Sequence, residues 1–167
     1  MGHEAHKRHA PARIRCWVIT VSDTRTEASD ASGRLMRDLL EGHGHTVSRY
    51  RLVRDEPREI TALLQAGGED PQVDALLLNG GTGISRRDRT YEAVVALLEK
   101  RLDGFGELFR YLSYQEIGPA AILSRAVAGV YRGKVIVSLP GSEDAVRLGM
   151  EKLVLPELGH MVAMARS

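Results

Sequence analysis

Cysteine is nearly absent from the sequence, with Cys16 as its single example among 167 residues. A lone cysteine cannot form an internal disulfide, and this fits a reducing cytoplasm. Charge of one sign is not in excess either: the formal net charge is +1, which argues against the basic face of a nucleic-acid-binding protein. No apolar run approaches the roughly 20 residues of a membrane-spanning helix, and the polar start MGHEAHKRHAPAR lacks the apolar core of a signal peptide. We therefore expect a cytoplasmic protein without a membrane or nucleic-acid partner.

The length and hydrophobic content predict one folded domain. The 167 residues, 43% of them hydrophobic, suffice for a domain that buries roughly two-thirds of its unfolded surface. We expect this domain over residues 13–167, after a flexible tail over residues 1–12. His3, His6 and His9 in the tail could bind a transition metal. Nothing there would pre-form a site, however, so we interpret the tail as disordered.

Apolar runs alternate with amphipathic segments along the chain. The sequence predicts a buried strand at residues 13–22, an alternating strand at residues 45–56 and a third strand at residues 73–79, with helices at residues 32–41, 56–68 and 90–102. This alternation predicts a parallel sheet covered by helices on both faces.

The second half of the sequence is predicted to be richer in helix. Residues 106–129 are expected to be mostly helical, with a break at Gly118-Pro119. A tight turn at Arg132-Gly133, a last strand that ends at Leu139 and a long final helix follow. Gly141 and Ser142 are expected to start that helix, with Ser142 as its cap.

Three loops are expected at the same edge of the predicted sheet. In parallel sheets the ligand crevice lies outside the carboxyl ends of the strands. The three strand ends lead into Ser22-Asp23, Arg54-Asp55-Glu56 and the segment from Gly80 to Asp88.

The third loop has the composition of an anion site. Gly80, Gly81 and Gly83 would expose backbone N–H groups, and the following helix would add its unpaired amides. Arg86 and Arg87 could donate charge-assisted hydrogen bonds to the same anion. The loop is not a dinucleotide fingerprint, because Arg86 occupies the last glycine position, and it lacks the Gly-Lys-Ser/Thr of a P-loop. A sharp turn alone would also use glycines, but so many in succession favour phosphate binding.

Two carboxylates flank the predicted phosphate site. Asp88 follows the glycines, and Asp55 ends the second predicted strand. Asp88 could simply place a negative charge at a helix N-terminus. Together with Asp55 beside a phosphate it suggests Mg²⁺, which takes one or two carboxylates plus phosphate oxygens and waters. These loops therefore predict metal-assisted phosphoryl or nucleotidyl transfer.

Longer stretches of the sequence resemble a known family. NGGTGISRRDRTYEA, GFGELFR, ILSRAVAG and LPGS, with TVSD after the first strand and RDE after the second, are similar to the MogA/MoaB type of molybdopterin-binding family in molybdenum cofactor synthesis. The similarity runs from Arg13 onward, and YLSYQEIGPAAILSRAVAGV looks closer to the MoaB branch. The resemblance implies a three-layer α/β/α fold with a mainly parallel sheet, assembled as a homotrimer or as a hexamer of two trimers.

The resemblance also implies a reaction and its participants. Active members adenylylate molybdopterin with Mg-ATP and release pyrophosphate, so Mg²⁺ is the implied cofactor and ATP and molybdopterin are the implied substrates. Asp55 and Asp88 match the two functional aspartates, which hold Mg²⁺ and orient the molybdopterin phosphate. The candidate binding residues, which include Arg87 from the glycine-rich loop itself, are Ser22, Asp23, Gly80, Gly81, Thr82, Gly83, Arg87, Glu107, Ser124, Arg125, Pro140, Gly141 and Ser142. Arg125 could equally be a structural ion-pair partner.

The sequence departs from the family pattern at two places. Asn79 stands where threonine is usual, and Arg89-Thr90-Tyr91 stands where Val-Thr-Pro is usual. Losing a proline in the first turn of a helix removes little pre-organisation, and Asn79 can still form hydrogen bonds. We interpret both departures as tolerated.

Two functions of the family stay open on the sequence. Some MoaB-branch members lack one of the acidic residues, so the presence of both aspartates favours an active adenylyltransferase. The alternative is a non-catalytic, trimeric scaffold of the same pathway that binds molybdopterin. The resemblance also leaves room for contacts with other molybdenum cofactor enzymes, and Tyr111 and Tyr114 lie on a predicted helix that could be a subunit interface.

Overall fold

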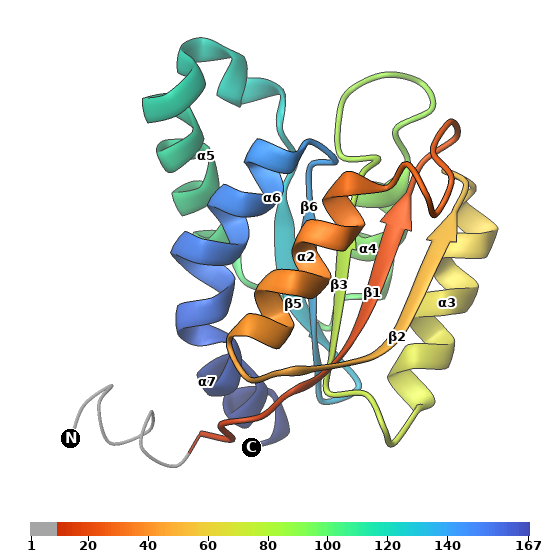
Figure 1. Cartoon of the computed structure of the whole chain (residues 1–167), viewed down its shortest axis with the longest axis vertical. Helices are drawn as coiled ribbons and strands as arrows, with labels where there is room; N and C mark the ends of the chain where they lie inside the picture. Colours follow the sequence, from red (N-terminus) through yellow and green to blue (C-terminus); the bar gives the residue numbers. More distant parts are fainter. Residues whose placement is uncertain (1–9) are drawn as a thin grey trace.

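The computed structural model describes residues 10–167, so His3, His6 and His9 of the predicted tail lie outside the described residues. Within the described part, the strands form a six-stranded sheet in the order β2-β1-β3-β6-β5-β4. Helices cover both faces of this sheet (Figure 1). The predicted three-layer α/β/α fold is confirmed.

The bounds of the elements, with labels as in Figure 1, are as follows. The strands are β1 (Arg15–Val21), β2 (Thr46–Val53), β3 (Ala75–Asn79), β4 (Lys100–Arg101), β5 (Val127–Tyr131) and β6 (Lys134–Leu139). The helices are α2 (Ala31–Gly42), α3 (Pro57–Glu69), α4 (Thr90–Leu97), α5 (Asp103–Ile117), α6 (Glu143–Gly149) and α7 (Leu155–Arg166). A 3₁₀ segment η1 (Gly118–Leu123) follows α5, and a π-helical segment η2 (Met150–Val154) joins α6 to α7.

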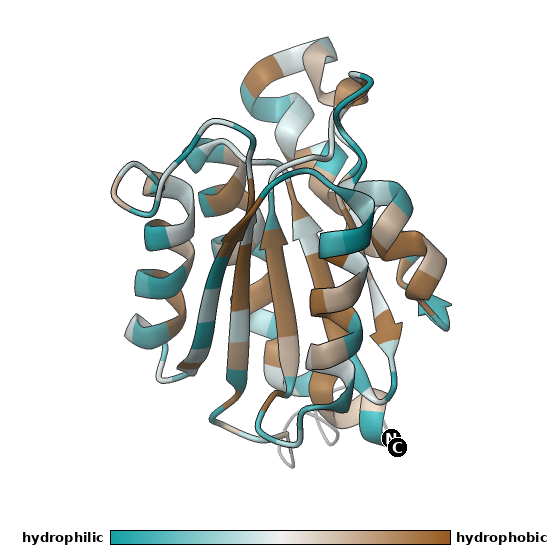
Figure 2. Ribbon diagram, turned by 90° about the vertical axis from the view of Figure 1, so that its right-hand side faces the viewer, coloured by the Kyte–Doolittle hydropathy of each residue, from teal (hydrophilic) through white to brown (hydrophobic). Residues whose placement is uncertain are grey.

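The central strands pack into two apolar cores, one on each face of the sheet. Cys16 and Val18 of β1 belong to the core beneath α2, α5, α6 and α7, whereas Trp17 and Ile19 belong to the core beneath α3 and α4. This division follows from strand geometry, because successive side chains point to opposite faces. Figure 2 shows brown strands between helices that carry teal residues on their outer sides. Burial raises the pKa of the Cys16 thiol to about 12, so Cys16 is a core residue without a reactive thiolate.

The parallel part of the sheet places the predicted loops together. β2, β1, β3 and β6 run parallel to one another, so their carboxyl ends meet at the upper edge in Figure 1. The segments that begin at Ser22, Arg54, Gly80 and Pro140 all leave the sheet at this edge.

The antiparallel edge of the sheet differs from the prediction. The helix predicted over residues 90–102 ends at Leu97, because the next residues form β4 and pair antiparallel with β5. Residues 127–129, inside the segment predicted to be mostly helical, belong to β5. The predicted turn at Arg132-Gly133 joins β5 to β6, and both of its residues have a positive φ. Both wrong assignments concern pairing between distant segments, which local periodicity does not report.

The long final helix is confirmed, but its hydrogen bonding changes midway. Ser142 caps it as predicted, since its hydroxyl accepts the N–H of Ala145 at 3.2 Å. At η2 the N–H of Leu155 donates to the carbonyl of Met150, five residues earlier. Pro156 follows and has no N–H to donate, which suits a wider turn at this point.

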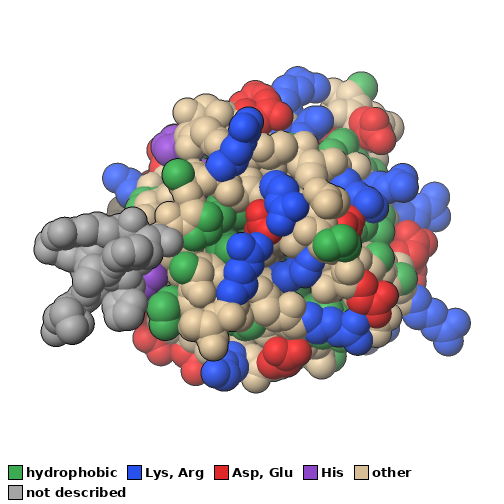
Figure 3. Space-filling model, turned by 90° about the horizontal axis from the view of Figure 1, so that it is seen from below, with side chains coloured by type: hydrophobic (Ala, Val, Ile, Leu, Met, Phe, Trp, Pro, Cys, Tyr) green, Lys and Arg blue, Asp and Glu red, His purple; other side chains and the backbone are tan. Residues whose placement is uncertain are grey.

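The opposite end of the sheet carries charges of both signs. Figure 3 shows this face with Lys and Arg side chains interspersed with Asp and Glu. Arg15 pairs with Asp74 at 2.7 Å, and Arg49 pairs with Asp70 at 2.8 Å.

Among residues 10–167, no helix combines the length and the apolar character needed to cross a bilayer.

Candidate functional site

Loops at the carboxyl end of the parallel strands enclose a cavity of about 460 Å³, which we call the glycine-loop cavity. Predicted site residues from several distant segments line it, namely Ser22, Gly80, Gly81, Thr82, Gly83, Asp88, Ser124, Pro140, Gly141 and Ser142. The wall opposite the glycines is largely apolar and includes Phe109 of α5 and Leu123 of η1. A polar floor with an apolar wall is a common arrangement in small-molecule sites.

The glycine-rich loop adopts a backbone that other residues disfavour. Gly80 and Gly81 have φ angles of +100° and +68°, a region that residues with a Cβ rarely enter. A Cβ at Gly80 would overlap the carbonyl oxygen of Val21. A Cβ at Gly81 would overlap the Thr90 hydroxyl and the Asp55 carboxylate. The two glycines therefore let the loop pass over the end of β1 and cover Asp55.

The loop uses its carbonyls for structure and leaves N–H groups for a ligand. The Gly81 carbonyl accepts the N–H of Thr90 at 3.1 Å, and the Thr82 carbonyl accepts the N–H of Arg125 at 3.2 Å. Within residues 10–167, the N–H groups of Gly81, Thr82 and Gly83 donate to no acceptor. Successive free N–H groups of this kind form an anion cradle.

Arg125 holds the glycine-rich loop from outside the cavity. Its guanidinium donates to the Gly83 carbonyl at 2.6 and 3.0 Å and to the Asp88 carbonyl at 3.1 Å. The same group pairs with Glu92 and lies 4.8 Å from the ring centre of Tyr91. Because these contacts occupy the guanidinium, Arg125 positions the loop, which is the structural role that the sequence left open.

Asp55 lies beneath the glycine-rich loop and is 5% exposed. Its Oδ1 accepts the N–H of Arg89, at the start of α4, at 3.1 Å. Burial raises the pKa of Asp55 to about 6; the Arg89 hydrogen bond opposes this rise, and the charges of Asp88 and Asp23 add to it. The amide at the start of α4 therefore stabilises Asp55, whereas the sequence suggested that the helix amides would face the phosphate.

Asp88 and Asp55 each keep one oxygen available. Oδ2 of Asp88 accepts the N–H of Ser85 at 2.9 Å. Among the described residues, Oδ1 of Asp88 and Oδ2 of Asp55 have no hydrogen-bond donor. The described part of the chain has no group of three or more His, Cys, Asp or Glu residues that could hold a metal alone. Such a donor set does not suit a closed zinc site, but it suits Mg²⁺, which takes one or two carboxylates beside phosphate oxygens and waters.

Asp23 and Arg87 bind each other at the rim of the site. The Arg87 guanidinium donates to Asp23 at 2.9 and 3.0 Å and to Glu56 at 3.0 Å. The hydrogen bonds from Arg87 hold the pKa of Asp23 below its usual range. Of the described residues that line the glycine-loop cavity, none is Arg86 or Arg87; Arg86 lines a separate hollow beside Ile84. The two cations assigned to the anion from the sequence thus lie outside this cavity.

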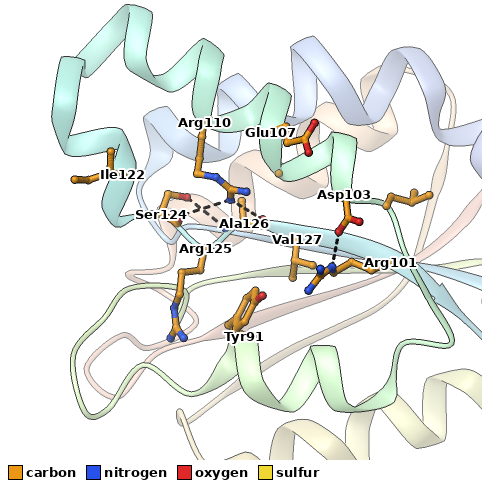
Figure 4. A pocket seen from close by; sticks show the side chains of 12 residues that line it. Tyr91, Arg101, Asp103, Glu107, Arg110, Ile122, Ser124, Arg125, Ala126 and Val127 are labelled. Atoms are coloured by element: carbon orange, nitrogen blue, oxygen red, sulfur yellow. Dashed lines mark hydrogen bonds and ion pairs between the residues drawn. The ribbon is translucent and has the colours of Figure 1, made fainter.

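A second cavity, of about 550 Å³, lies between α4, β4, α5 and residues 124–127. Figure 4 shows Tyr91, Glu107 and Arg110 around it, with Arg110 hydrogen-bonded to the segment at Ser124. Ser124 lines both cavities, but Glu107 lines only this one. The structure therefore places Glu107 with Ser124 and Arg125 around the second cavity, apart from the glycines of the first.

Sequence reasoning missed three polar residues of the glycine-loop cavity, namely Thr24, Arg25 and Ser113. Arg25 lines it and donates to the Gly141 carbonyl at 2.8 Å. Its position just after the end of β1 was an available signal. Ser113 of α5 also lines the cavity, and its spacing of one helical turn from Phe109 could have placed it on the same face.

The chain resembles known proteins over nearly its whole length. The family described as "Probable molybdopterin binding domain" matches residues 17–160. Molybdenum cofactor biosynthesis protein B of Halalkalibacterium halodurans is 53% identical over 163 residues, which cover 97% of this chain and 96% of that protein. A crystal structure of a molybdenum cofactor biosynthesis protein B is 52% identical and matches with a TM-score of 0.90, over 94% of this chain and 98% of that one.

A further solved structure resembles the chain at a lower sequence identity. The tungsten cofactor synthesizing protein MoaB of Pyrococcus furiosus is 41% identical, with a TM-score of 0.83 over 95% of this chain and 100% of that one. The match to the family covers most of the chain, and these relatives are alike over almost their full lengths. The chain therefore belongs to the molybdopterin-binding family of the MogA/MoaB type, and within it lies closer to the MoaB branch.

Proposed function

We propose that this protein acts in molybdenum cofactor biosynthesis, where it binds molybdopterin and adenylylates it with Mg-ATP. The observation that carries the proposal is the set of free N–H groups at Gly81, Thr82 and Gly83 beside the carboxylates of Asp55 and Asp88. An anion cradle next to two carboxylates suits phosphate chemistry assisted by a divalent cation. The printed names of the relatives, which refer to molybdenum cofactor biosynthesis, support the pathway.

The proposed reaction joins two phosphates. An oxygen of the molybdopterin phosphate attacks the α-phosphorus of ATP, a new phosphorus–oxygen bond forms, and the bond to the bridging oxygen of the β-phosphate breaks to release pyrophosphate. The attacking phosphate is ionised near neutral pH, so no strong general base is required. The main obstacles are repulsion between two polyanions and the alignment of the reacting atoms. The amides of the glycine-rich loop would hold one phosphate, while Arg125 keeps this loop in place.

Asp55 and Asp88 would hold Mg²⁺ through the oxygens that bind no described residue. When bound, the ion would supply positive charge that favours the phosphate chemistry. The hydrogen bond from Arg89 fixes the Asp55 carboxylate before the substrates arrive. A carboxylate fixed in advance needs no reorganisation during the reaction.

A molybdopterin-binding scaffold without catalysis is the alternative function. Such a scaffold requires the cavity but has no use for a buried carboxylate next to it. Burying Asp55 raises its pKa to about 6, and burial of an ionisable group disfavours its charged form. Because strongly shifted carboxylates tend to occur at functional sites, this observation favours the enzyme.

The direct test is an assay of the purified protein with molybdopterin, Mg²⁺ and ATP, in which both pyrophosphate and adenylyl-molybdopterin are measured. We expect the two products to form in equal amounts and to require the metal. Omission of molybdopterin is the control, since pyrophosphate released without it would indicate simple ATP hydrolysis. A protein that binds molybdopterin but forms neither product would leave the scaffold as its function.

We further propose that the protein assembles as a homotrimer or a larger oligomer through α5 and η1. These two segments expose large apolar side chains, at Leu108, Tyr111, Tyr114, Ile117, Ile122 and Leu123. Exposed apolar patches of this kind usually mark an interaction surface. Ile117 and Leu123 also line the glycine-loop cavity, so an interface here would border the site.

Charges introduced into this patch should dissociate the oligomer. We expect light scattering of the parent protein to give roughly three times the 18.4 kDa mass of one chain, or more. The double variant Tyr111→Glu with Ile122→Glu should shift the mass toward 18.4 kDa, because two buried charges would oppose the association. Met164→Glu is the control, since Met164 is an exposed apolar residue on α7. A parent protein that is monomeric at all concentrations would refute the assembly.

A further inference from the structure

The glycine-loop cavity contains one positively charged side chain among the described residues that line it, and this is Arg25. Asp88 is the only negatively charged member of the same described lining. Of the two arginines expected to fill this role, Arg87 is already bound by Asp23 and Glu56, and Arg86 lines a separate hollow. Backbone amides can donate to a phosphate oxygen but carry no net charge, so a site built from amides alone would lack a cation and the two parallel hydrogen bonds of a guanidinium.

Local hydrogen bonds fix the backbone that presents Arg25. The Ser22 hydroxyl oxygen accepts the N–H of Thr24 at 3.2 Å and the N–H of Arg25 at 3.0 Å. A serine that accepts such bonds folds the chain into a compact turn at the end of β1. Ser22, which the sequence assigned to the ligand, therefore also sets the position of Arg25.

The guanidinium of Arg25 lies beside the glycine-rich loop and keeps most of its donors. One of its N–H groups donates to the Gly141 carbonyl at 2.8 Å. A Cβ placed on Gly141 would lie 3.2 Å from the Cα of Gly80 and 3.9 Å from Nη1 of Arg25. Because a guanidinium carries five N–H donors, the contact with Gly141 leaves several for an anion on the cavity side.

The nearest carboxylate does not occupy these remaining donors. Asp30 Oδ1 lies 3.7 Å from Nη1 of Arg25, which is longer than a hydrogen bond. Asp30 is itself committed to capping α2, since Oδ1 accepts the N–H of Gly33 at 2.9 Å and Oδ2 accepts the hydroxyl of Tyr50 at 2.5 Å. Asp30 and Gly141 thus orient the guanidinium of Arg25, and most of its N–H donors remain available.

We propose that Arg25 is a phosphate-binding residue of this site, which acts together with the free N–H groups of Gly81, Thr82 and Gly83. The proposal rests on the function proposed above. It names the side chain that offsets part of the negative charge on a phosphate group of one of the two substrates. The recognised group is a phosphate oxygen pair, which the planar guanidinium contacts with two donors. The phosphate belongs either to molybdopterin or to ATP, and binding measurements with each compound separate the two sources.

The test is isothermal titration calorimetry of the full chain with Mg-ATP and, separately, with molybdopterin. Arg25→Met removes the charge and keeps most of the stem, and Arg25→Lys keeps the charge without the planar fork. We expect Arg25→Met to weaken binding of at least one compound by about tenfold to a hundredfold, the range for a lost charge-assisted hydrogen bond. Arg25→Lys should recover part of this loss.

Two further variants separate ligand binding from a structural role. Arg51→Met makes the same charge change at an exposed residue of β2 outside both cavities and should leave both affinities unchanged. Ser32→Ala removes the other donor to the Gly141 carbonyl, a hydroxyl at 2.6 Å. If Arg25 acted only by holding Gly141, Ser32→Ala would weaken binding as much as Arg25→Met does, and the proposal would be overturned.

The outcomes also distinguish this proposal from the proposed reaction. Weaker binding of molybdopterin alone, of ATP alone or of both supports Arg25 and identifies the phosphate. Unchanged affinities for both compounds in Arg25→Met overturn the assignment, even when the parent protein forms adenylyl-molybdopterin. A parent protein that binds molybdopterin without turnover refutes the adenylyltransferase, while the affinity of Arg25→Met still decides the role of Arg25. A parent protein that binds neither compound overturns both.

Discussion

Replacing Asp55 by asparagine is expected to lower the rate of adenylyl-molybdopterin formation by at least about a hundredfold, the usual effect of removing a key electrostatic group. The amide oxygen of asparagine can still accept the N–H of Arg89, which donates to Oδ1 of Asp55 at 3.1 Å. The local fold should therefore be preserved while the negative charge is lost. The measurement is the initial rate of pyrophosphate release at saturating molybdopterin and Mg-ATP, together with the circular dichroism of the variant.

Two matched variants show whether a loss of rate in Asp55→Asn is specific to the proposed metal ligands. Asp88→Asn should lower the rate to a similar extent, because Asp88 is the other proposed Mg²⁺ ligand. Asp38→Asn makes the same change on the exposed face of α2 and should leave the rate unaltered. Full activity in Asp55→Asn would contradict the role of Asp55 in holding the metal. Comparable losses in all three variants would indicate a general effect of charge.

The pH dependence gives a second readout of Asp55. Burial raises its pKa from 3.8 to about 6, and only the ionised form would bind Mg²⁺. We therefore expect the rate to rise with pH through about pH 6. The contribution of Asp55 to folding stability has the opposite sign: between pH 3.8 and about 6 the folded state binds this proton more tightly, so stability falls as pH rises. Asp55→Asn should remove this part of the stability profile.

Replacing Gly81 by alanine is expected to damage both stability and activity. Gly81 has a φ of +68°, and a Cβ there would overlap the Thr90 hydroxyl and the Asp55 carboxylate. Backbone strain and displacement of buried polar groups together should lower the free energy of unfolding by about 2 to 4 kcal/mol. Product formation should be lost even in the folded fraction, because the loop amides and Asp55 cannot both keep their positions. Urea denaturation and the pyrophosphate assay measure the two effects.

Gly104 provides the matched control for Gly81. It lies in the first turn of α5, its φ is not in the left-handed region, and a Cβ there would meet no atom within 4 Å. Gly104→Ala should therefore keep the activity and leave the stability unchanged or raise it by up to about 1 kcal/mol. A loss in Gly104→Ala as large as that in Gly81→Ala would show that the effect does not depend on the loop conformation.

The general layout of this protein could be predicted from its sequence because it depends on local patterns. Apolar runs of strand length alternate with amphipathic segments, and the helix ends carry recognisable signals such as Ser142. The anion site that we propose at Gly80 to Gly83 could also be suggested from local sequence, since the backbone itself would supply its donors. Asp55 and Asp88 could be related to this loop because parallel strands end at one edge.

The antiparallel edge could not be predicted in the same way. Lys100 and Arg101 have a strand conformation because they pair with Val130 and Gly129, and this pairing is a tertiary contact. In the sequence they continue a helical pattern that begins at Thr90. Strand formation in such short segments is decided by the neighbouring strand more than by the residues themselves.

Local sequence was enough to predict the alternation of elements and to point to Asp55, Asp88 and the glycine-rich loop that we propose as an anion site, because each depends on neighbouring residues or on a motif. The contacts of the arginines near this loop, in contrast, became visible in the folded structure alone. Arg87 is bound by Asp23 and Glu56, Arg125 supports the loop carbonyls, and Arg86 lines a separate hollow. Among the described residues that line the glycine-loop cavity, Arg25 is the one arginine, and its hydrogen bond to the Gly141 carbonyl leaves other donors available. Partners for a long flexible side chain come from distant segments, so folding, and not local sequence, selects them.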